Sequence, residues 1–179
     1  MMVPIIVLLI AFDSFWPRWI ALALFIAASI TDYFDGKIAR AEGKITPLGQ
    51  VMDPIADKLL VVSTLVMLIA VDSIAGPAII AALIILTREI VIAGLREFLA
   101  GSKIKMPVSN LAKWKTGVQM VALGFLIVDQ HGPWWSDWLL KHSIHYIGDL
   151  LLWIAAGFTA VSGYSYLRRG LEYIQKLPS

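Results

Sequence analysis

Residues 150–167 read LLLWIAAGFTAVSGYSYL, eighteen residues that form the longest run in the chain without a charged side chain. An apolar segment of this length is read as a candidate membrane-spanning helix. Within it, Ala156, Ala160 and Gly163 follow one another at intervals of four and three residues. Small residues at such intervals let helices approach closely in lipid. The run therefore predicts a helix that packs against other helices inside a membrane.

The composition of the whole chain favours the same environment. Of 179 residues, 59% are hydrophobic and 16% are charged, whereas soluble domains are about 45–50% apolar and about 25% charged. A disordered chain would show the opposite bias. The chain has no cysteine for disulfides or thiolate sites, and its net charge of +2 gives no basis for nucleic-acid binding. We expect a polytopic membrane protein.

Five further uncharged apolar runs are shorter, with 12 to 15 residues each: 1–12, 19–31, 59–71, 73–87 and 116–128. Since a spanning helix needs about 20 residues, the helices must continue past these runs and carry charges at membrane depth. Such charges face the bundle interior or a water-filled cavity and are candidates for function. We predict an all-α bundle of six transmembrane helices over 1–12, 18–36, 53–72, 77–100, 110–129 and 146–171.

The first of these helices is too short to span, because twelve residues cover about 18 Å. Either the natural chain starts earlier or this helix is short. The start at Met1 and Met2 has no basic segment and no small-residue cleavage site, which argues against a signal peptide.

The basic residues predict the orientation of the bundle. Segments 37–58, 88–115 and 168–176 hold thirteen of the fifteen Lys and Arg residues, and only Arg18 and Lys141 lie in the other connections. The positive-inside rule then places both termini in the cytoplasm. The opposite interface receives an aromatic belt of Trp16, Trp19, Trp134, Trp135 and Trp138. His131, His142 and His145 are expected there as solvated loop residues.

Four aspartates stand at the inner ends of the second and third predicted helices. Asp32 and Asp35 are three residues apart, and Asp53 and Asp57 are four apart, so each pair lies on one helix face. The predicted loop 37–52 is long enough to bring the pairs side by side. Because converging carboxylates repel unless cations neutralise them, oxygen ligands alone indicate Mg²⁺, Mn²⁺ or Ca²⁺. The alternative is that these are interfacial carboxylates, or ion-pair partners of Lys37, Arg40 and Lys58.

The segment around the aspartates carries a longer pattern, Asp32-x2-Asp35-Gly36-x2-Ala39-Arg40-x8-Gly49-x3-Asp53-x3-Asp57. Small residues there would let a flat ligand approach the backbone, and Arg40 could meet a phosphate. At every position the string resembles the signature of the CDP-alcohol phosphotransferase family. The six-helix layout is similar to the family across nearly the whole chain, so residues 1–179 are expected to form one such domain.

A second region resembles one branch of that family. Residues 87–100 read TREIVIAGLREFLA and residues 108–120 read VSNLAKWKTGVQM; both are similar to the bacterial phosphatidylglycerophosphate synthases, which use glycerol 3-phosphate as acceptor. A phosphate-bearing acceptor needs cations beside the metal site. The candidates are Arg88, Arg96, Lys113 and Lys115. The alternative is that these residues snorkel to the inner interface.

The resemblance implies transfer of the phosphatidyl group from CDP-diacylglycerol to the acceptor, with release of CMP, by an enzyme of the bacterial inner membrane whose active site faces the cytoplasm. It implies two divalent cations, Mg²⁺ or Mn²⁺, on the four aspartates, with Asp57 as the general base. CDP would contact Asp32, Gly36, Ala39, Arg40, Gly49 and Asp53. The resemblance also suggests a homodimer.

The sequence departs from the family pattern at its N-terminus, and other functions remain as alternatives. The family usually has an N-terminal amphipathic segment with Asn-Pro-Asn and an Arg before the first span, which this sequence lacks. Within the family, the acceptor could instead be inositol phosphate, serine or phosphatidylglycerol. A divalent-cation transporter is disfavoured because the aspartates gather at one boundary and no internal repeat is visible. A membrane scaffold would need no fixed aspartate spacing.

Overall fold

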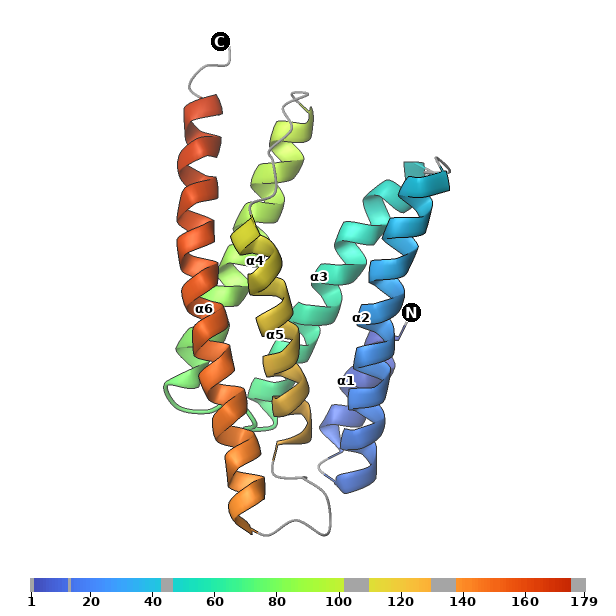
Figure 1. Cartoon of the computed structure of the whole chain (residues 1–179), viewed down its shortest axis with the longest axis vertical. Coiled ribbons are helices and arrows are strands. Elements are labelled where there is room, and N and C mark those ends of the chain that lie inside the picture. Colours follow the sequence, from blue (N-terminus) through green and yellow to red (C-terminus); the bar gives the residue numbers. More distant parts are fainter. Residues whose placement is uncertain (1, 13, 43–46, 102–109, 130–137, 175–179) are drawn as a thin grey trace. The chain divides into compact units, whose positions relative to one another are not determined.

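The computed structural model describes residues 2–12, 14–42, 47–101, 110–129 and 138–174. For some residues in these ranges the structure describes the backbone but not the side chain: 32–42, 47–54, 57, 100, 101, 110–113 and 138–142. The described residues form six helices and no strand, which confirms the all-α prediction (Figure 1). The helices are α1 (Val3–Ala11), α2 (Phe15–Glu42), α3 (Pro47–Ala70), α4 (Ala78–Gly101), α5 (Asn110–Val128) and α6 (Trp138–Ile174).

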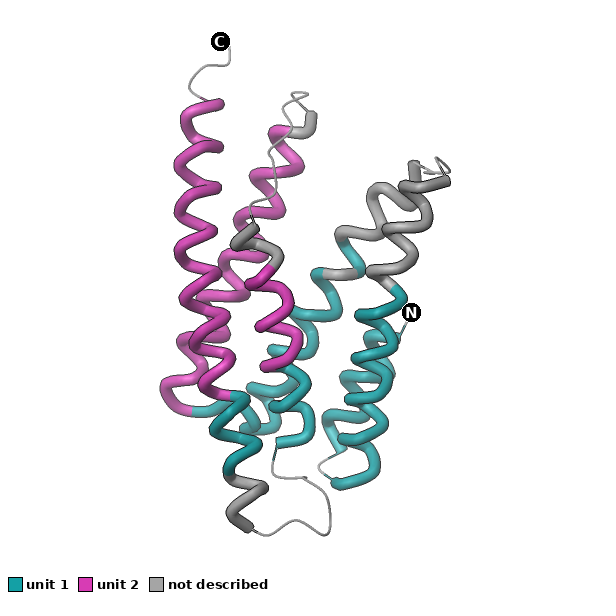
Figure 2. The backbone as a smooth tube through the Cα atoms, viewed as in Figure 1, with its two compact units in different colours: residues 1–75, 123–148 teal, residues 76–122, 149–179 magenta. Residues whose placement is uncertain are grey.

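The chain divides into two compact units, coloured separately in Figure 2. Unit 1 comprises Met1–Ala75 and Leu123–Gly148, and unit 2 comprises Gly76–Ala122 and Asp149–Ser179. Both α5 and α6 therefore contribute one part to each unit.

In unit 1, α1 packs against α2 and α3. Ile6 and Ile10, four residues apart on α1, are fully buried, as are Phe25 on α2 and Leu65 on α3. The core is mostly apolar, but it also buries polar residues, among them Thr64 and Ser73, and the Arg18 side chain at the beginning of α2 is completely buried.

Arg18 links three helix ends of unit 1. Its Nη1 donates to Ser73 Oγ at 3.1 Å, between α3 and α4, and to the Ile127 carbonyl at 3.2 Å, in the last turn of α5. The last carbonyls of a helix have no partner within the helix and carry partial negative charge. Arg18 therefore acts as a cap for α5.

Two aspartates end helices of unit 1 with a left-handed backbone. Asp72 follows α3 with φ 58°, and Asp129 follows α5 with φ 47°. Asp adopts this conformation more readily than most residues. Asp129 Oδ1 also lies 2.7 Å from His145 Nδ1. The prediction that His142 and His145 are loop residues is wrong, since α6 already begins at Trp138; His131 lies outside the described residues.

In unit 2, glycines bring α6 close to α4. A Cβ atom on Gly163 would lie 3.0 Å from Arg88 Cγ, and one on Gly170 would lie 2.5 Å from Leu95 Cδ2. The predicted close packing is thus confirmed at Gly163, and Ala156 is also buried, whereas Ala160 is exposed. Gly170 extends the contact beyond the predicted segment.

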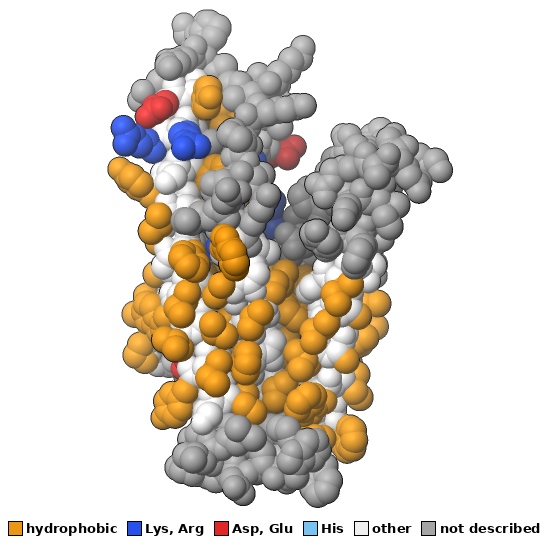
Figure 3. All heavy atoms as spheres, in the orientation of Figure 1, with side chains coloured by type: hydrophobic (Ala, Val, Ile, Leu, Met, Phe, Trp, Pro, Cys, Tyr) orange, Lys and Arg blue, Asp and Glu red, His pale blue; other side chains and the backbone are white. Residues whose placement is uncertain are grey.

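Two helices are long and apolar enough to cross a membrane, over Ala78–Leu99 and Ser143–Ile174, when the described residues are tested. Phe15–Thr31, Lys58–Ala70 and Trp114–Val128 are shorter apolar helices. Large hydrophobic side chains stand on the surface of many helices, among them Trp16 and Trp114 at 72% exposure. Figure 3 shows such side chains along the flanks of both units, with charged side chains gathered near the C-terminal end of α6. Broad apolar surfaces of this kind mark contact with lipid or protein.

Candidate active site

The α2–α3 hairpin positions the four aspartates. Helix α2 ends at Glu42 and α3 begins at Pro47, so Asp35 and Asp53 lie about 10 Å and about 9 Å along their helices from the turn at 1.5 Å per residue. Asp32 and Asp57 are each ten residues from these ends, or about 15 Å. α2 and α3 contact each other, and the two acidic pairs lie at similar distances from the successive ends of these helices.

The predicted loop 37–52 is much shorter in the structure. Gly36 does not end α2, because residues 37–42 include good helix formers that carry the helix on to Glu42. Pro47 opens α3 at the first helical position, where its missing N–H is not needed. Gly36, Ala39 and Arg40 are therefore in α2 and Gly49 is in α3, so the acidic pairs lie on two successive helices with no long loop between them.

The chemistry of these residues fits a hard divalent cation. The aspartate side chains lie outside the description, and the side chains within it form no group of three or more His, Cys, Asp or Glu that could hold a metal. The motif on these two helices contains four aspartates and no His or Cys. Such oxygen sets suit Mg²⁺, Mn²⁺ or Ca²⁺.

Unit 2 holds a separate group of charged side chains, which we call the cationic cluster: Arg88, Glu89, Arg96 and Lys115. Glu89 Oε1 is 3.3 Å from Arg88 Nη1 and also accepts a hydrogen bond from Lys115 Nζ. The side chains of Arg88, Glu89 and Lys115 are only 14%, 15% and 3% exposed. One carboxylate thus serves two partly buried cations from α4 and α5.

Arg96 has a different environment. Its residue is exposed, its Nη2 donates to the Tyr166 hydroxyl at 3.3 Å, and its guanidinium carbon lies 5.2 Å from the centre of the Tyr166 ring. The Arg88 guanidinium carbon is 5.8 Å from the same ring. Among the described side chains, the cluster holds three cations and one carboxylate, a net charge of +2, so it is suited to bind an anion.

Three of the four predicted acceptor-site residues are therefore close together. Lys113, the fourth, lies in α5, and its side chain is outside the described residues. Sequence reasoning missed Glu89 and Tyr166 as members of the group. The sequence could have indicated Glu89, because a carboxylate in an apolar helix needs a cationic partner. No such signal existed for Tyr166, which meets Arg96 across seventy residues of sequence.

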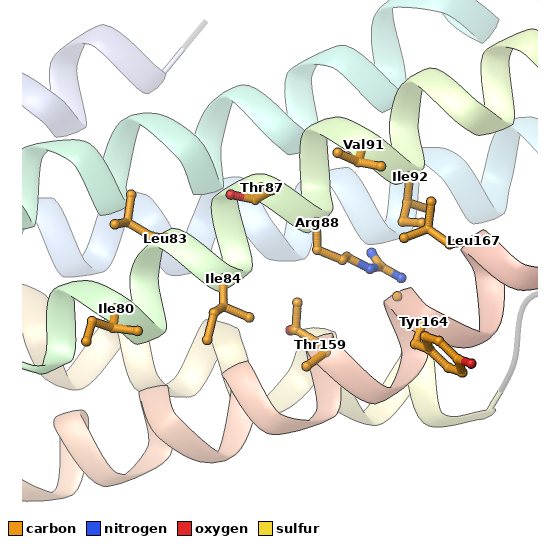
Figure 4. A pocket seen from close by; sticks show the side chains of 12 residues that line it. Ile80, Leu83, Ile84, Thr87, Arg88, Val91, Ile92, Thr159, Tyr164 and Leu167 are labelled. Atoms are coloured by element: carbon orange, nitrogen blue, oxygen red, sulfur yellow. The ribbon is translucent and has the colours of Figure 1, made fainter.

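An apolar cavity of about 390 Å³ adjoins the cluster between α4 and α6. In Figure 4, Arg88 extends from α4 toward α6 beside Ile92, Tyr164 and Leu167. The hydrocarbon stem of Arg88 thus lines an apolar wall, as long basic side chains do at membrane boundaries, while its guanidinium belongs to the cationic cluster.

Known proteins are similar in sequence to this chain over most of its length. The chain is 44% identical to the CDP-diacylglycerol–glycerol-3-phosphate 3-phosphatidyltransferase of Rickettsia typhi, over 97% of this chain and 92% of that protein. Proteins of the same name from Cereibacter sphaeroides and Bacillus subtilis are 34% and 35% identical, over 94% and 85% of this chain and 89% and 74% of their own lengths. Residues 1–161 match the family described as CDP-alcohol phosphatidyltransferase. The chain therefore belongs to the CDP-alcohol phosphatidyltransferase family, a family of transferase enzymes.

Proposed function

We propose that this protein transfers the phosphatidyl group from CDP-diacylglycerol to glycerol 3-phosphate, giving phosphatidylglycerophosphate and CMP in phospholipid biosynthesis. The observation that carries the choice of acceptor is the net positive cationic cluster in unit 2. The acceptor differs from an uncharged alcohol by its phosphate, and a partly buried excess of positive charge favours a phosphate dianion. The names of the relatives agree with this choice.

The α2–α3 hairpin would bind the donor. The family generally depends on divalent cations, and we assign two, Mg²⁺ or Mn²⁺, to Asp32, Asp35, Asp53 and Asp57. When bound, these ions neutralise the pyrophosphate and stabilise the leaving CMP. Gly36, Ala39, Arg40 and Gly49 are assigned to the cytidine and phosphate pocket together with Asp32 and Asp53.

The reaction needs a base on the acceptor hydroxyl. We assign this role to Asp57, which would take the proton while the hydroxyl oxygen forms a bond to the β-phosphorus that carries diacylglycerol. The bond between that phosphorus and the bridging oxygen breaks, and the electron pair leaves with CMP. Arg88, Arg96, Lys113 and Lys115 would hold the acceptor phosphate, so that the hydroxyl and not the phosphate reacts.

The membrane arrangement is part of the proposal. Six spans with both termini in the cytoplasm would put the acidic motif and most basic residues at the inner boundary of a bacterial cytoplasmic membrane. There the lipid tails of the donor remain in the bilayer while the acceptor arrives from the cytosol. We further propose that residues 1–179 act as one domain and that the protein works as a homodimer.

Incorporation of different acceptors tests the assignment directly. The protein, reconstituted in phospholipid vesicles with Mg²⁺, is given labelled CDP-diacylglycerol and, in separate reactions, glycerol 3-phosphate, inositol phosphate, serine or phosphatidylglycerol. We expect labelled phosphatidylglycerophosphate and CMP in the first reaction. Preferred use of another acceptor would refute the choice of glycerol 3-phosphate, and Mg²⁺ uptake without any transfer would indicate a transporter.

A further inference from the structure

Tyr166 of α6 contacts both arginines of the cationic cluster. The Arg88 and Arg96 guanidinium carbons lie 5.8 Å and 5.2 Å from the centre of its ring, within the range of a cation–π interaction. Its hydroxyl accepts the hydrogen bond from Arg96 Nη2. The residue is only 3% exposed, so Tyr166 is a fixed platform rather than a mobile surface side chain.

The two arginines differ in what else restrains them. Arg88 shares the Glu89 carboxylate with Lys115. Within the described part of the chain, Arg96 has the ring and hydroxyl of Tyr166 as its polar contacts, with no carboxylate partner. An exposed arginine without such a contact would sample many rotamers, which costs free energy when it is fixed on a ligand. Tyr166 therefore restrains Arg96 without neutralising its charge.

We propose that Tyr166 is a positioning residue for the acceptor phosphate, an inference that rests on the proposed function. The ring holds two like-charged guanidinium groups together, and the hydroxyl orients Arg96. A guanidinium carries five N–H donors, and one bond to Tyr166 leaves the others for phosphate oxygens. A carboxylate in the place of Tyr166 would hold Arg96 as firmly but would cancel the charge that selects a phosphate-bearing acceptor.

Steady-state kinetics of the reconstituted protein test the proposal, with Tyr166→Phe and Tyr166→Leu. The first change removes the hydroxyl and keeps the ring. Because the bond is long at 3.3 Å, we expect the KM for glycerol 3-phosphate to rise about threefold to tenfold, the value of an ordinary hydrogen bond and less than that of a good bond to a charged group. Tyr166→Leu also removes the ring and should raise this KM further. In both variants, kcat and the KM for CDP-diacylglycerol should change less than about twofold, as for a loss of uniform acceptor binding.

A double-mutant cycle shows whether Tyr166 acts through Arg96. If it does, Tyr166→Phe should have little further effect on the acceptor KM in an Arg96→Ala background, since coupled residues are not additive. Equal effects in the two backgrounds would overturn the proposal. The matched control is Tyr164, two residues away on α6 and 70% exposed, where Tyr164→Phe and Tyr164→Leu should leave the acceptor KM unchanged.

The kinetics distinguish a merely structural role of Tyr166 from an error in the proposed acceptor. Loss of kcat together with a rise in both KM values in Tyr166→Phe would indicate disturbed packing and overturn the proposal. If the unmodified protein rejects glycerol 3-phosphate but uses inositol phosphate, the proposed function fails. A selective rise in the KM for inositol phosphate in Tyr166→Phe would then still support Tyr166 as a phosphate-positioning residue, and an unchanged KM would refute it.

Discussion

Unit 1 buries an arginine in an apolar helix and unit 2 partly buries one, but the surroundings differ. Arg18 is completely buried, and its hydrogen bonds to Ser73 and Ile127 go to a hydroxyl and a helix-end carbonyl. Arg88 stands beside two further cations with one carboxylate among them. The first arrangement supplies a donor to a helix end and a hydroxyl, whereas the second holds an excess of positive charge among the described side chains. Burial alone therefore does not assign a role to an arginine; we propose that the charge balance of its neighbours distinguishes the structural Arg18 from Arg88 in the proposed acceptor site.

The α2–α3 hairpin, like the cationic cluster, concentrates charge of one sign, because its motif contains four aspartates. The largest expected effect is at Asp57. We expect Asp57→Asn to lower kcat by about 10²-fold to 10⁴-fold, the usual contribution of a general base, while binding of CDP-diacylglycerol persists. Turnover with labelled donor and a separate binding measurement would check this. Asp72→Asn is the control, since Asp72 is exposed and Asn tolerates its left-handed backbone; wild-type turnover by Asp57→Asn would refute the base assignment.

The next largest effect is expected in the cationic cluster. Arg96→Ala should raise the KM for glycerol 3-phosphate by about tenfold to a hundredfold, the value of a hydrogen bond to a charged group, with far less effect on CDP-diacylglycerol binding. Initial rates at varied acceptor and fixed donor measure this. Arg168→Ala is a matched control on α6, because its side chain is 71% exposed and pairs with Glu172. An unchanged acceptor KM in Arg96→Ala would remove Arg96 from the acceptor site.

Replacing Arg18 should lower the stability of the protein without changing its KM values, in contrast to Arg96→Ala. Arg18→Leu leaves the Ile127 carbonyl and the Ser73 hydroxyl without this donor, so we expect a loss of about 2 kcal/mol in stability and unchanged acceptor and donor KM values. Thermal unfolding in detergent and kinetics in vesicles measure the two quantities. A selective rise in the acceptor KM would break the distinction between the two arginines.

The smallest effect is expected at the close approach of α6 to α4 at Gly170. A Cβ atom on Gly170 would meet three atoms of Leu95 within 3.0 Å, so Gly170→Ala should cost about 1 kcal/mol of stability through overpacking. Gly157→Ala is the control, because a Cβ atom there meets nothing within 4 Å. Thermal unfolding distinguishes the two variants, and equal midpoints would contradict the close contact.

Much of the fold was predictable, and the errors have physical causes. Hydrophobic runs predicted each of the six helices found in the described residues, because a backbone in an apolar medium must satisfy its own hydrogen bonds and does so as a helix. Their ends were less certain: α2 continues past Gly36, and α6 begins at Trp138, because local helix propensity in polar segments is not visible as hydrophobic periodicity. Two described helices reach the length and apolarity of a span; the remaining spans stay a prediction.

The sequence by itself determined the acidic motif, the family and the positions of the candidate cations, because these depend on residue type and spacing along one or two helices. Only the tertiary structure decided which charges are balanced. It paired Glu89 with Arg88 and Lys115, and it brought Tyr166 against Arg96 from seventy residues away. Contacts of this kind depend on how helices pack across a unit, and short-range periodicity contains no information about them.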